Sequence, residues 1–494
     1  MAFRRFVRTF YHDKLAKLDY QFMSFNEDTR VKIPAILHLC KLGYTFLPLA
    51  KARFDIRTNI ATDIFADSIL KINPQLQASD IKKLVDEITM VLDYDDVGKT
   101  FYSMLTATSG IKLIDFDNFN TNSFHVVTEL PCINEEEEFR PDITLLINGM
   151  PLVFIEVKVP NNKEGILAER KRMNTRFANK KFRRFANITQ LMVFSNNMPY
   201  EDGVIEPLMG AYYATSTYKD IMFNYFREEN EDLFHNLLPD DEEIENLVLK
   251  TTNYVTVKHS PEFASSKNAL NPTNKIISSL MNKERLAFVL KYAIAYVNEA
   301  NGLEKHVMRY PQLFATKAIE HELNNGIKKG VIWHTQGSGK TALAFYNVQF
   351  LTDYFQQKNV IPKFYFIVDR IDLADQAKTE FTNRGLIPKV ISSRIDFIND
   401  LKKVGALSNH SGRNEITIVN IQKFSENSII NEMNDYDIHV QRIYFIDEAH
   451  RSYNPKGLSL ANLYNSDPKA IKIALTGTPL LKEVAKEYDT KALF

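Results

Sequence analysis

The chain has 494 residues, of which 45% are hydrophobic and 25% charged. This composition is that of a globular protein, and the length exceeds what one compact core can hold, so we expect two or three domains. Lysine plus arginine equals aspartate plus glutamate at 61 each, which excludes overall charge as the means of attracting nucleic acid. The two cysteines, Cys40 and Cys132, indicate neither a disulfide framework nor a structural zinc site. No apolar run reaches the length of a membrane span, so we expect a cytoplasmic protein without a membrane partner.

Residues 1–237 mix helical patterns with strand-like runs such as "ITLLI", "LVFIEVKV" and "ITQLMVF", which predicts one α/β domain. Residues 238–300 are expected to form an acidic and helical connector. Its acidic start, "LPDDEEIENL", predicts a solvated connector or a helix N-terminus, and "NKERLAFVLKYAIAYV" (282–297) has the apolar spacing of a bridging helix.

From residue 301 to 494, short apolar runs alternate with helical stretches. The runs are "GVIWHT", "FYFIVD", "ITIVNI", "RIYFID" and "IKIALTG". Such alternation predicts a parallel sheet covered by helices on both faces.

The first of these runs leads into the turn "QGSGKT" and a helix-forming segment. In such a turn the backbone N–H groups face phosphate oxygens, Lys340 neutralises the phosphates and Thr341 can ligate magnesium. His334 stands where the strict P-loop pattern has glycine. The alternative is a glycine-rich strand-to-helix turn with an exposed lysine. The turn itself comprises Gly337, Ser338 and Gly339.

Two further strand ends carry polar groups that suit nucleotide chemistry. "RIYFIDEAHRS" ends a strand in Asp447, which can hold magnesium, and Glu448, which can orient the attacking water. The next strand runs into "ALTGTP", with Thr476, Gly477 and Thr478. The alternative reading of the acids is a surface pair that caps a helix.

The elements "GSGKT", "DEAH" and "TGTP", in this order, resemble motifs I, II and III of superfamily 2 helicases and translocases. The resemblance implies a RecA-like lobe that uses ATP and Mg²⁺. It also implies that Tyr310 stacks on adenine and that Gln312 reads its edge, both within "RYPQLFATKAIE". By the same resemblance, "FIVDRIDLADQ" (366–376) and "IVNIQKF" (418–424) would contact the nucleic-acid backbone.

The stretch "PDITLLINGMPLVFIEVKVP" (141–160) places charges among residues that belong in a core. Period-two alternation puts Glu156 and Lys158 on one strand face, and both faces are largely apolar. The structural explanation is a buried Glu–Lys pair. The functional explanation adds Asp142: two carboxylates gather a hard divalent metal and the lysine stabilises charge on phosphate. This combination predicts metal-assisted phosphodiester hydrolysis.

The hairpin register decides whether those carboxylates can meet. "NG" at 148–149 favours a two-residue turn, but a regular ladder from that turn pairs Asp142 with Ile155 and puts it on the wrong face. We therefore predict a three-residue loop or a β-bulge, helped by Pro151, which lacks a ladder N–H.

The spacing of Pro141–Asp142 and Glu156–Val157–Lys158 resembles the PD-(D/E)xK nuclease signature. The resemblance implies a further acid from an early helix, for which Glu27 is the candidate metal ligand. A Q-x-x-x-Y element found in related nucleases is missing, since Gln190 has no tyrosine four residues later.

A dense basic segment, "ERKRMNTRFANKKFRRF" (169–185), follows the nuclease signature. It predicts either a solvated helix face or a surface that tracks DNA phosphates. The candidate DNA-binding residues are Arg170, Lys171, Arg172, Lys180, Lys181, Arg183 and Arg184.

A PD-(D/E)xK nuclease domain followed by a RecA-like parallel-sheet P-loop domain resembles the R (restriction and translocation) subunit of type I restriction enzymes, HsdR. The resemblance implies an ATP- and Mg²⁺-dependent type I site-specific deoxyribonuclease in the bacterial or archaeal cytoplasm. Such a subunit translocates double-stranded DNA and cuts unmethylated foreign DNA away from the recognition site, with modification and specificity subunits as partners.

No second RecA-like lobe follows "TGTP", so we expect an N-terminal portion that binds ATP weakly and hydrolyses it poorly. Two other functions remain open. One is a DNA-repair helicase-nuclease without methyltransferase partners, and the other is a nucleotide-gated DNA-binding scaffold with an inactive nuclease.

Overall fold

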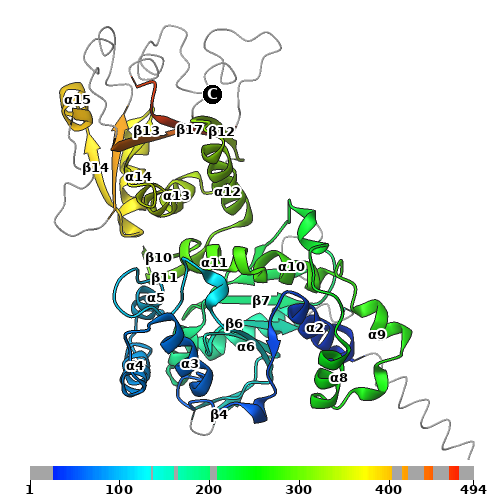
Figure 1. Ribbon diagram of the computed structural model, residues 1–494. Coiled ribbons are helices and arrows are strands. Elements are labelled where there is room, and N and C mark those ends of the chain that lie inside the picture. Colours follow the sequence, from blue (N-terminus) through cyan, green and yellow to red (C-terminus); the bar gives the residue numbers. More distant parts are fainter. Residues whose placement is uncertain are drawn as a thin grey trace, which may run out of the picture. The chain divides into compact units, whose positions relative to one another are not determined.

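The computed structural model describes residues 26–134, 137–160, 165–200, 209–335, 337–402, 414–420, 439–448 and 467–477 (Figure 1). The chain divides into two compact units. The first comprises Met1–Ile294 and Leu303–Val307, and the second comprises Ala295–Gly302 and Met308–Phe494.

The first unit is built on a seven-stranded mixed sheet with the strand order β1-β2-β5-β6-β7-β8-β9. β1 is parallel to β2 and β6 to β7, while the other neighbours run antiparallel. Every residue of β5 and β6 is buried, as expected for their apolar sequences. The strands are β1 Thr45–Phe46, β2 Phe124–Thr128, β5 Ile143–Ile147, β6 Met150–Val157, β7 Leu191–Ser195, β8 Ala211–Ala214 and β9 Asn224–Tyr225, with a separate pair, β3 Cys132–Asn134 and β4 Glu137–Phe139.

Helices cover both faces of this sheet. Met173 and Phe177 of α6 pack against Phe154 of β6 on one face. Ser195, which alternation directs to the other face, hydrogen-bonds Thr273 of α10 over 2.8 Å. The helices are α2 Ile33–Lys41, α3 Thr62–Ile72, α4 Ala78–Val91, α5 Lys99–Leu105, α6 Gly165–Ala178, α7 Arg183–Ile188, α8 Glu242–Thr251, α9 Pro261–Ser266, α10 Pro272–Met281 and α11 Lys283–Tyr292.

The segment expected to form a connector folds largely with the first unit, because α8 and α10 lie against α2. Its acidic start is a helix N-terminus, as predicted: the Asp241 carboxylate accepts the backbone N–H groups of Glu243 and Ile244 and caps α8. The predicted helix over 282–297 is wrong in its second half. α11 ends at Tyr292, and "IAYV" enters strand β10 (Ile294–Glu299), since its β-branched and aromatic residues pair with β11 (Gly302–Val307).

The second unit contains six parallel strands in the order β12-β17-β16-β13-β15-β14. Five of them coincide with the predicted apolar runs. β14 was not expected, because "IPKVI" is short and contains a proline and a lysine. The elements are α12 Tyr310–Asn324, β12 Lys329–Trp333, α13 Lys340–Gln356, β13 Ile361–Val368, α14 Ile371–Asn383, β14 Ile387–Ile391, α15 Arg394–Lys402, β15 Glu415–Asn420, β16 Val440–Asp447 and β17 Ile471–Thr476.

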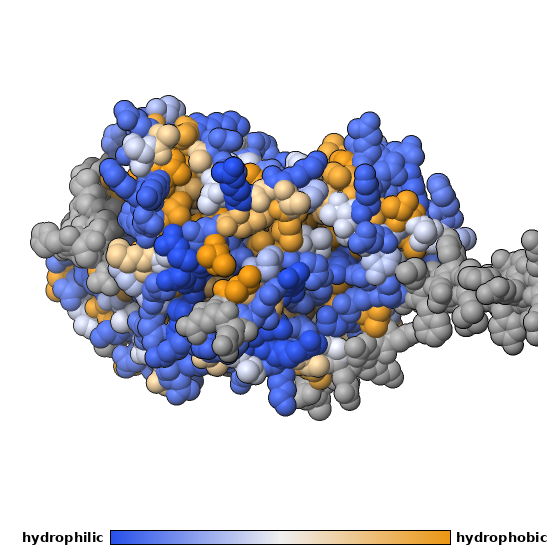
Figure 2. Space-filling model, turned by 90° about the horizontal axis from the view of Figure 1, so that it is seen from below, coloured by the Kyte–Doolittle hydropathy of each residue, from blue (hydrophilic) through white to orange (hydrophobic). Residues whose placement is uncertain are grey.

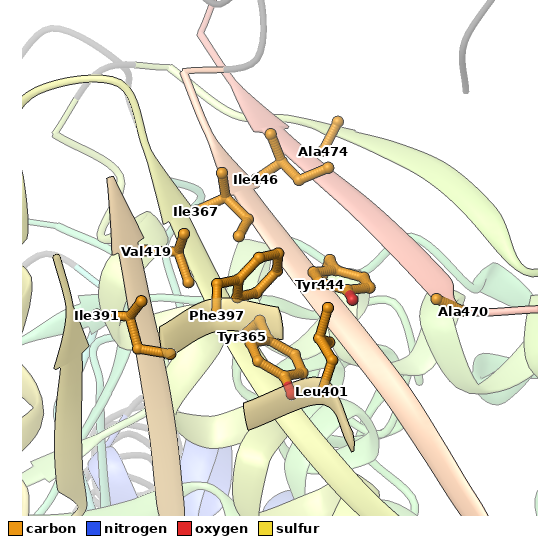
Figure 3. Close-up of a cluster of buried hydrophobic side chains, with 10 residues drawn as sticks. All are labelled: Tyr365, Ile367, Ile391, Phe397, Leu401, Val419, Tyr444, Ile446, Ala470 and Ala474. Carbon is orange, nitrogen blue, oxygen red and sulfur yellow. The ribbon is translucent and has the colours of Figure 1, made fainter. Parts of the chain in front are cut away.

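Helices lie on both faces of the parallel sheet, as predicted. Tyr365 of β13 and Tyr444 of β16 stack with ring centroids 4.9 Å apart, and Phe397 of α15 covers Tyr365 edge-on (Figure 3). On the opposite face, Phe366 packs edge-on against Phe381 of α14. The face of the molecule drawn in Figure 2 is mostly hydrophilic, with hydrophobic residues in small separate groups, as expected for a surface in water.

The turn between β5 and β6 is fixed by its own two residues. Asn148 and Gly149 both have positive φ, 49° and 78°, as a two-residue hairpin turn with Asn-Gly requires. The Asn148 side chain donates to the Leu113 carbonyl over 2.9 Å and accepts the Ser123 N–H over 2.8 Å. A Cβ on Gly149 would lie 2.7 Å from the Ala61 carbonyl oxygen. The turn therefore packs so closely against the start of α3 that a larger residue does not fit at position 149.

Gly149→Ala is expected to lower the free energy of unfolding by more than Gly110→Ala. Gly110 has a similar φ of 83° but nothing within 4 Å of an added Cβ, so its variant carries only the backbone strain, about 1–2 kcal/mol. Gly149→Ala adds a clash with backbone atoms. Urea-unfolding midpoints followed by circular dichroism measure the difference, and equal midpoints for the two variants would contradict it.

Candidate functional site

A β-bulge brings Asp142 opposite Glu156. The turn pairs Ile147 with Met150, and a register shift at Leu145/Leu146 leaves Leu152 as an extra residue in β6. The ladder then resumes with Ile143 opposite Ile155, which places Asp142 opposite Glu156. The predicted bulge is confirmed, directly after Pro151, and it forms together with the two-residue turn.

Asp142, which is half-buried, and Glu156, which is buried, form a carboxyl pair. The Val157 N–H donates to Asp142 Oδ2 over 2.9 Å, which fixes the aspartate. Glu156 is only 5% exposed, and its Oε1 has no hydrogen-bond partner among the described residues. Burial raises the pKa of Glu156 well above its ordinary value, and the negative charges of Asp142 and Glu169 raise it further. Glu156 therefore resists ionisation.

Lys158 lies among carboxylates that come from distant parts of the chain. Its Nζ is 3.4 Å from Glu27 Oε1, 3.7 Å from Asp142 Oδ2 and 3.9 Å from Glu169 Oε2. Burial favours the neutral amine, but these carboxylates outweigh it and raise the pKa of Lys158. Burial also raises the pKa of Glu27. The structure thus brings Glu27, Asp142, Glu156 and Lys158 together.

Glu169, on α6, is the member of this cluster that sequence reasoning missed. It is 3% exposed on its side chain and forms ion pairs with Arg172 and Arg176. One signal could have revealed it: Glu169 is at helical spacing from the apolar Ile166 and Met173, so it falls on the inward stripe of the helix.

The donor set fits a magnesium ion. No group of three or more His, Cys, Asp or Glu side chains within the described ranges is arranged to hold a metal. Mg²⁺, however, commonly takes only one or two protein carboxylates and keeps several waters. The partnerless Oε1 of Glu156 is a hard donor of this kind, and Asp142 lies opposite Glu156 on the neighbouring strand.

Most basic residues of the segment 169–185 form ion pairs with acidic residues. It forms α6, a short 3₁₀ turn (Lys180–Phe182) and α7. Lys171 and Lys180 are exposed, and Arg170 lies over the Phe223 ring at 5.4 Å. The ion pairs of the others are Arg172–Glu169, Lys181–Glu137, Arg183–Asp95 and Arg184–Asp93.

In the second unit, the glycine-rich turn joins β12 to α13 as predicted. Gly337 and Gly339 have φ values of 77° and 81°, which favour glycine. Lys340 opens α13, is buried, and lies 3.3 Å from Glu448 Oε1. Thr341 follows in the first turn of the helix. Asp447 ends β16, and burial raises its pKa to about 6, with the Glu448 charge adding to the effect.

His334 extends the strand where the strict motif has glycine. Its N–H donates to the Thr476 carbonyl over 3.0 Å, and Trp333 Nε1 donates to the Gly477 carbonyl over 3.1 Å. The backbone at His334 is therefore extended, and no glycine is required there. The hydroxyl oxygen of Ser338 is buried without a hydrogen-bond partner in the described part of the turn. Thr478 lies outside the described residues.

Gln312 contacts the glycine-rich turn directly. Its Nε2 donates to the carbonyls of Gly339 and Ser338 over 3.0 and 3.4 Å. Tyr310 begins the same helix, α12, so both residues of the proposed adenine motif are in the element that adjoins the turn. Of "IVNIQKF", residues 421–424 lie outside the described residues.

Two family models match the chain. The model of the type I restriction enzyme R protein N terminus (HSDR_N) matches residues 24–200, and the SWI2/SNF2 ATPase model matches residues 311–494. These two regions, in this order, are those of a type I restriction enzyme R (endonuclease) subunit. The first unit of the chain carries the HSDR_N region with a mixed sheet, and the second unit carries a SWI2/SNF2-like ATPase lobe with a parallel sheet.

The curated relatives that the chain matches are longer than the region matched. A Methanocaldococcus jannaschii chain with the provisional name of type I restriction enzyme MjaIXP endonuclease subunit is 27% identical over 96% of this chain and 44% of its own length. The HindI endonuclease subunit of Haemophilus influenzae is 25% identical over 90% and 40%. This chain thus spans less than half of these relatives. A solved SWI2/SNF2 ATPase core of Sulfolobus solfataricus with double-stranded DNA aligns over 41% of this chain and 36% of that one, with 15% identity and a TM-score of 0.28.

Within the described ranges of this R-subunit chain, no helix has both the length and the apolar character needed to span a membrane.

Glu156→Gln is expected to stabilise the protein near pH 8 when a chelator is present. As pH rises past the ordinary glutamate value, the unfolded carboxyl ionises before the folded one, so the wild type loses stability up to the raised folded pKa. Glutamine removes this penalty. The urea-unfolding midpoint should rise relative to wild type at pH about 8, and the gain should shrink toward pH about 5.

Glu228→Gln is the matched control. Glu228 is also buried, with a side chain 6% exposed, but it pairs with Arg285 at 3.1 Å. Its replacement should lower the midpoint at the higher pH, because it removes the negative charge that pairs with Arg285. A Glu156→Gln midpoint at or below that of wild type near pH 8 would contradict the raised pKa.

Proposed function

We propose that the first unit hydrolyses phosphodiester bonds of double-stranded DNA and that the second unit couples ATP hydrolysis to DNA translocation. The observation that carries the nuclease half is the β-bulge, which puts Asp142 opposite Glu156 and leads the strand into Lys158, itself surrounded by carboxylates. If these buried positions served stability alone, apolar residues would be expected there.

The roles of the nuclease residues follow from their positions. Asp142 and Glu156 would hold Mg²⁺, and Glu27 would be a further ligand. Bound Mg²⁺ supplies a Lewis acid that polarises the phosphoryl oxygen and lowers the pKa of water. Lys158 stays protonated among the carboxylates, so its ammonium group can stabilise negative charge on the phosphate. Loss of either carboxylate would remove one of the two direct oxygen ligands and so weaken the binding of the ion.

The nucleotide site supports ATP hydrolysis. Lys340 would leave Glu448 for the β and γ phosphates when ATP binds, and Thr341 and Asp447 would hold Mg²⁺. Glu448 is then released to orient the attacking water. Tyr310 and Gln312 would recognise adenine next to the turn.

The biological setting follows from the family. An R subunit with this nuclease and this motor would work with modification and specificity subunits in a bacterial or archaeal cytoplasm. It would cut unmethylated foreign DNA away from the recognition site. The exposed Lys171 and Lys180, together with neighbouring arginines, would contact the DNA backbone.

Cleavage of an unmethylated plasmid by the assembled complex tests this proposal. The R subunit that carries this sequence is combined with its modification and specificity subunits, with and without ATP and Mg²⁺. Glu156→Gln and Lys158→Ala should each reduce cleavage by about 10³-fold or more while ATP hydrolysis continues. Lys340→Ala should abolish ATP hydrolysis and, with it, cleavage. Glu228→Gln should cleave like the wild type.

Two outcomes would contradict the proposal. Full cleavage by Glu156→Gln would make the buried charges structural and favour a scaffold with no nuclease activity at this site. Equal cleavage of methylated and unmethylated plasmids, without the partner subunits, would favour a repair helicase-nuclease instead.

A further inference from the structure

Glu169 occupies a core position of α6. The buried residues of that helix recur at the spacing of one inward face: Ile166, Glu169, Met173 and Phe177. The Glu169 side chain is 3% exposed, and burying a carboxylate costs free energy that an apolar residue would not. Packing alone therefore does not account for a glutamate at this place.

Three cations share the Glu169 carboxylate. Its Oε2 lies 2.7 Å from Arg172 Nη2 and 3.9 Å from Lys158 Nζ, and its Oε1 lies 3.4 Å from Arg176 Nη1. The Arg176 guanidinium also lies 4.6 Å above the centroid of the Phe139 ring, which restrains it. One negative charge thus orients two guanidinium groups beside the same lysine that lines the nuclease centre.

Arg172 keeps most of its hydrogen-bonding capacity. Its side chain is 57% exposed, and a guanidinium has five N–H donors, of which one ion pair uses few. The planar fork of donors matches phosphate oxygens. Arg183 and Arg184 do not belong to this cluster. Each forms an ion pair with an acid that is distant in sequence: Arg183 with Asp95 and Arg184 with Asp93.

We propose that Arg172 and Arg176, held by Glu169, form a clamp for a DNA backbone phosphate next to the cleavage centre. Glu169 is a positioning residue: it sets the two guanidiniums and helps to place Lys158. The clamp rests on the proposed nuclease function, and it would fix the strand without reading its sequence, since phosphate contacts position DNA but do not specify bases.

The test uses the assembled restriction complex with Arg172→Gln and Arg176→Gln in the R subunit. Arg57→Gln is the matched control, because Arg57 is 45% exposed and pairs with Asp55 at 3.0 Å. Plasmid cleavage and DNA-dependent ATP hydrolysis are measured over a range of salt concentrations. Each clamp variant should cleave about tenfold more slowly at unchanged ATP hydrolysis. Cleavage should recover as salt is lowered, because phosphate binding strengthens. The control should match the wild type.

Glu169→Gln should slow cleavage by about 10- to 100-fold, with partial recovery in Glu169→Asp, which retains the charge. An aspartate variant no better than the glutamine variant would contradict the positioning role. If Glu169→Gln does not fold, the two arginine variants still carry the test.

Cleavage at wild-type rate by both arginine variants at every salt concentration, with Glu156→Gln inactive, would overturn the clamp and leave the nuclease centre standing. Full activity of Glu156→Gln would overturn both.

Discussion

The extra residue Leu152 in β6 is the constraint on which the chemistry of the first unit depends. A strand alternates its side chains with a period of two, so one inserted residue moves every later side chain to the opposite face. The turn at Asn148–Gly149 would otherwise send Asp142 and Glu156 to opposite sides of the sheet. With the bulge, both carboxyl groups and Lys158 reach the face that α6 covers, where Glu169 meets them.

Both units place their charged groups where apolar strands end, and both sites are costly to form. Burial raises the pKa of Glu156 well above normal in the first unit, and it raises the pKa of Asp447 to about 6 in the second. Each site relieves part of this cost with one lysine, Lys158 or Lys340. The surrounding sheets bury enough apolar surface to tolerate such groups, and a bound cation would relieve the rest.

The sequence was most informative where a local pattern determines local geometry. The P-loop turn, the strand ends at Asp447 and Thr476, the parallel sheet and the bulge could all be predicted, because spacing and alternation constrain them. It was least informative where the outcome depends on contacts between distant segments. Glu169 joins the site through tertiary packing of a helix, and the basic segment is neutralised in part by Asp93 and Asp95, which no local pattern links to it.

We propose that the bulge creates a site for one divalent cation between Asp142 and Glu156. Crystals of this chain soaked in Mn²⁺, which can replace Mg²⁺ at oxygen sites, would test it most directly by anomalous scattering. We expect a single strong peak in the first unit, in contact with carboxylate oxygens of both residues. No peak there, with the two carboxylates turned apart, would contradict the account.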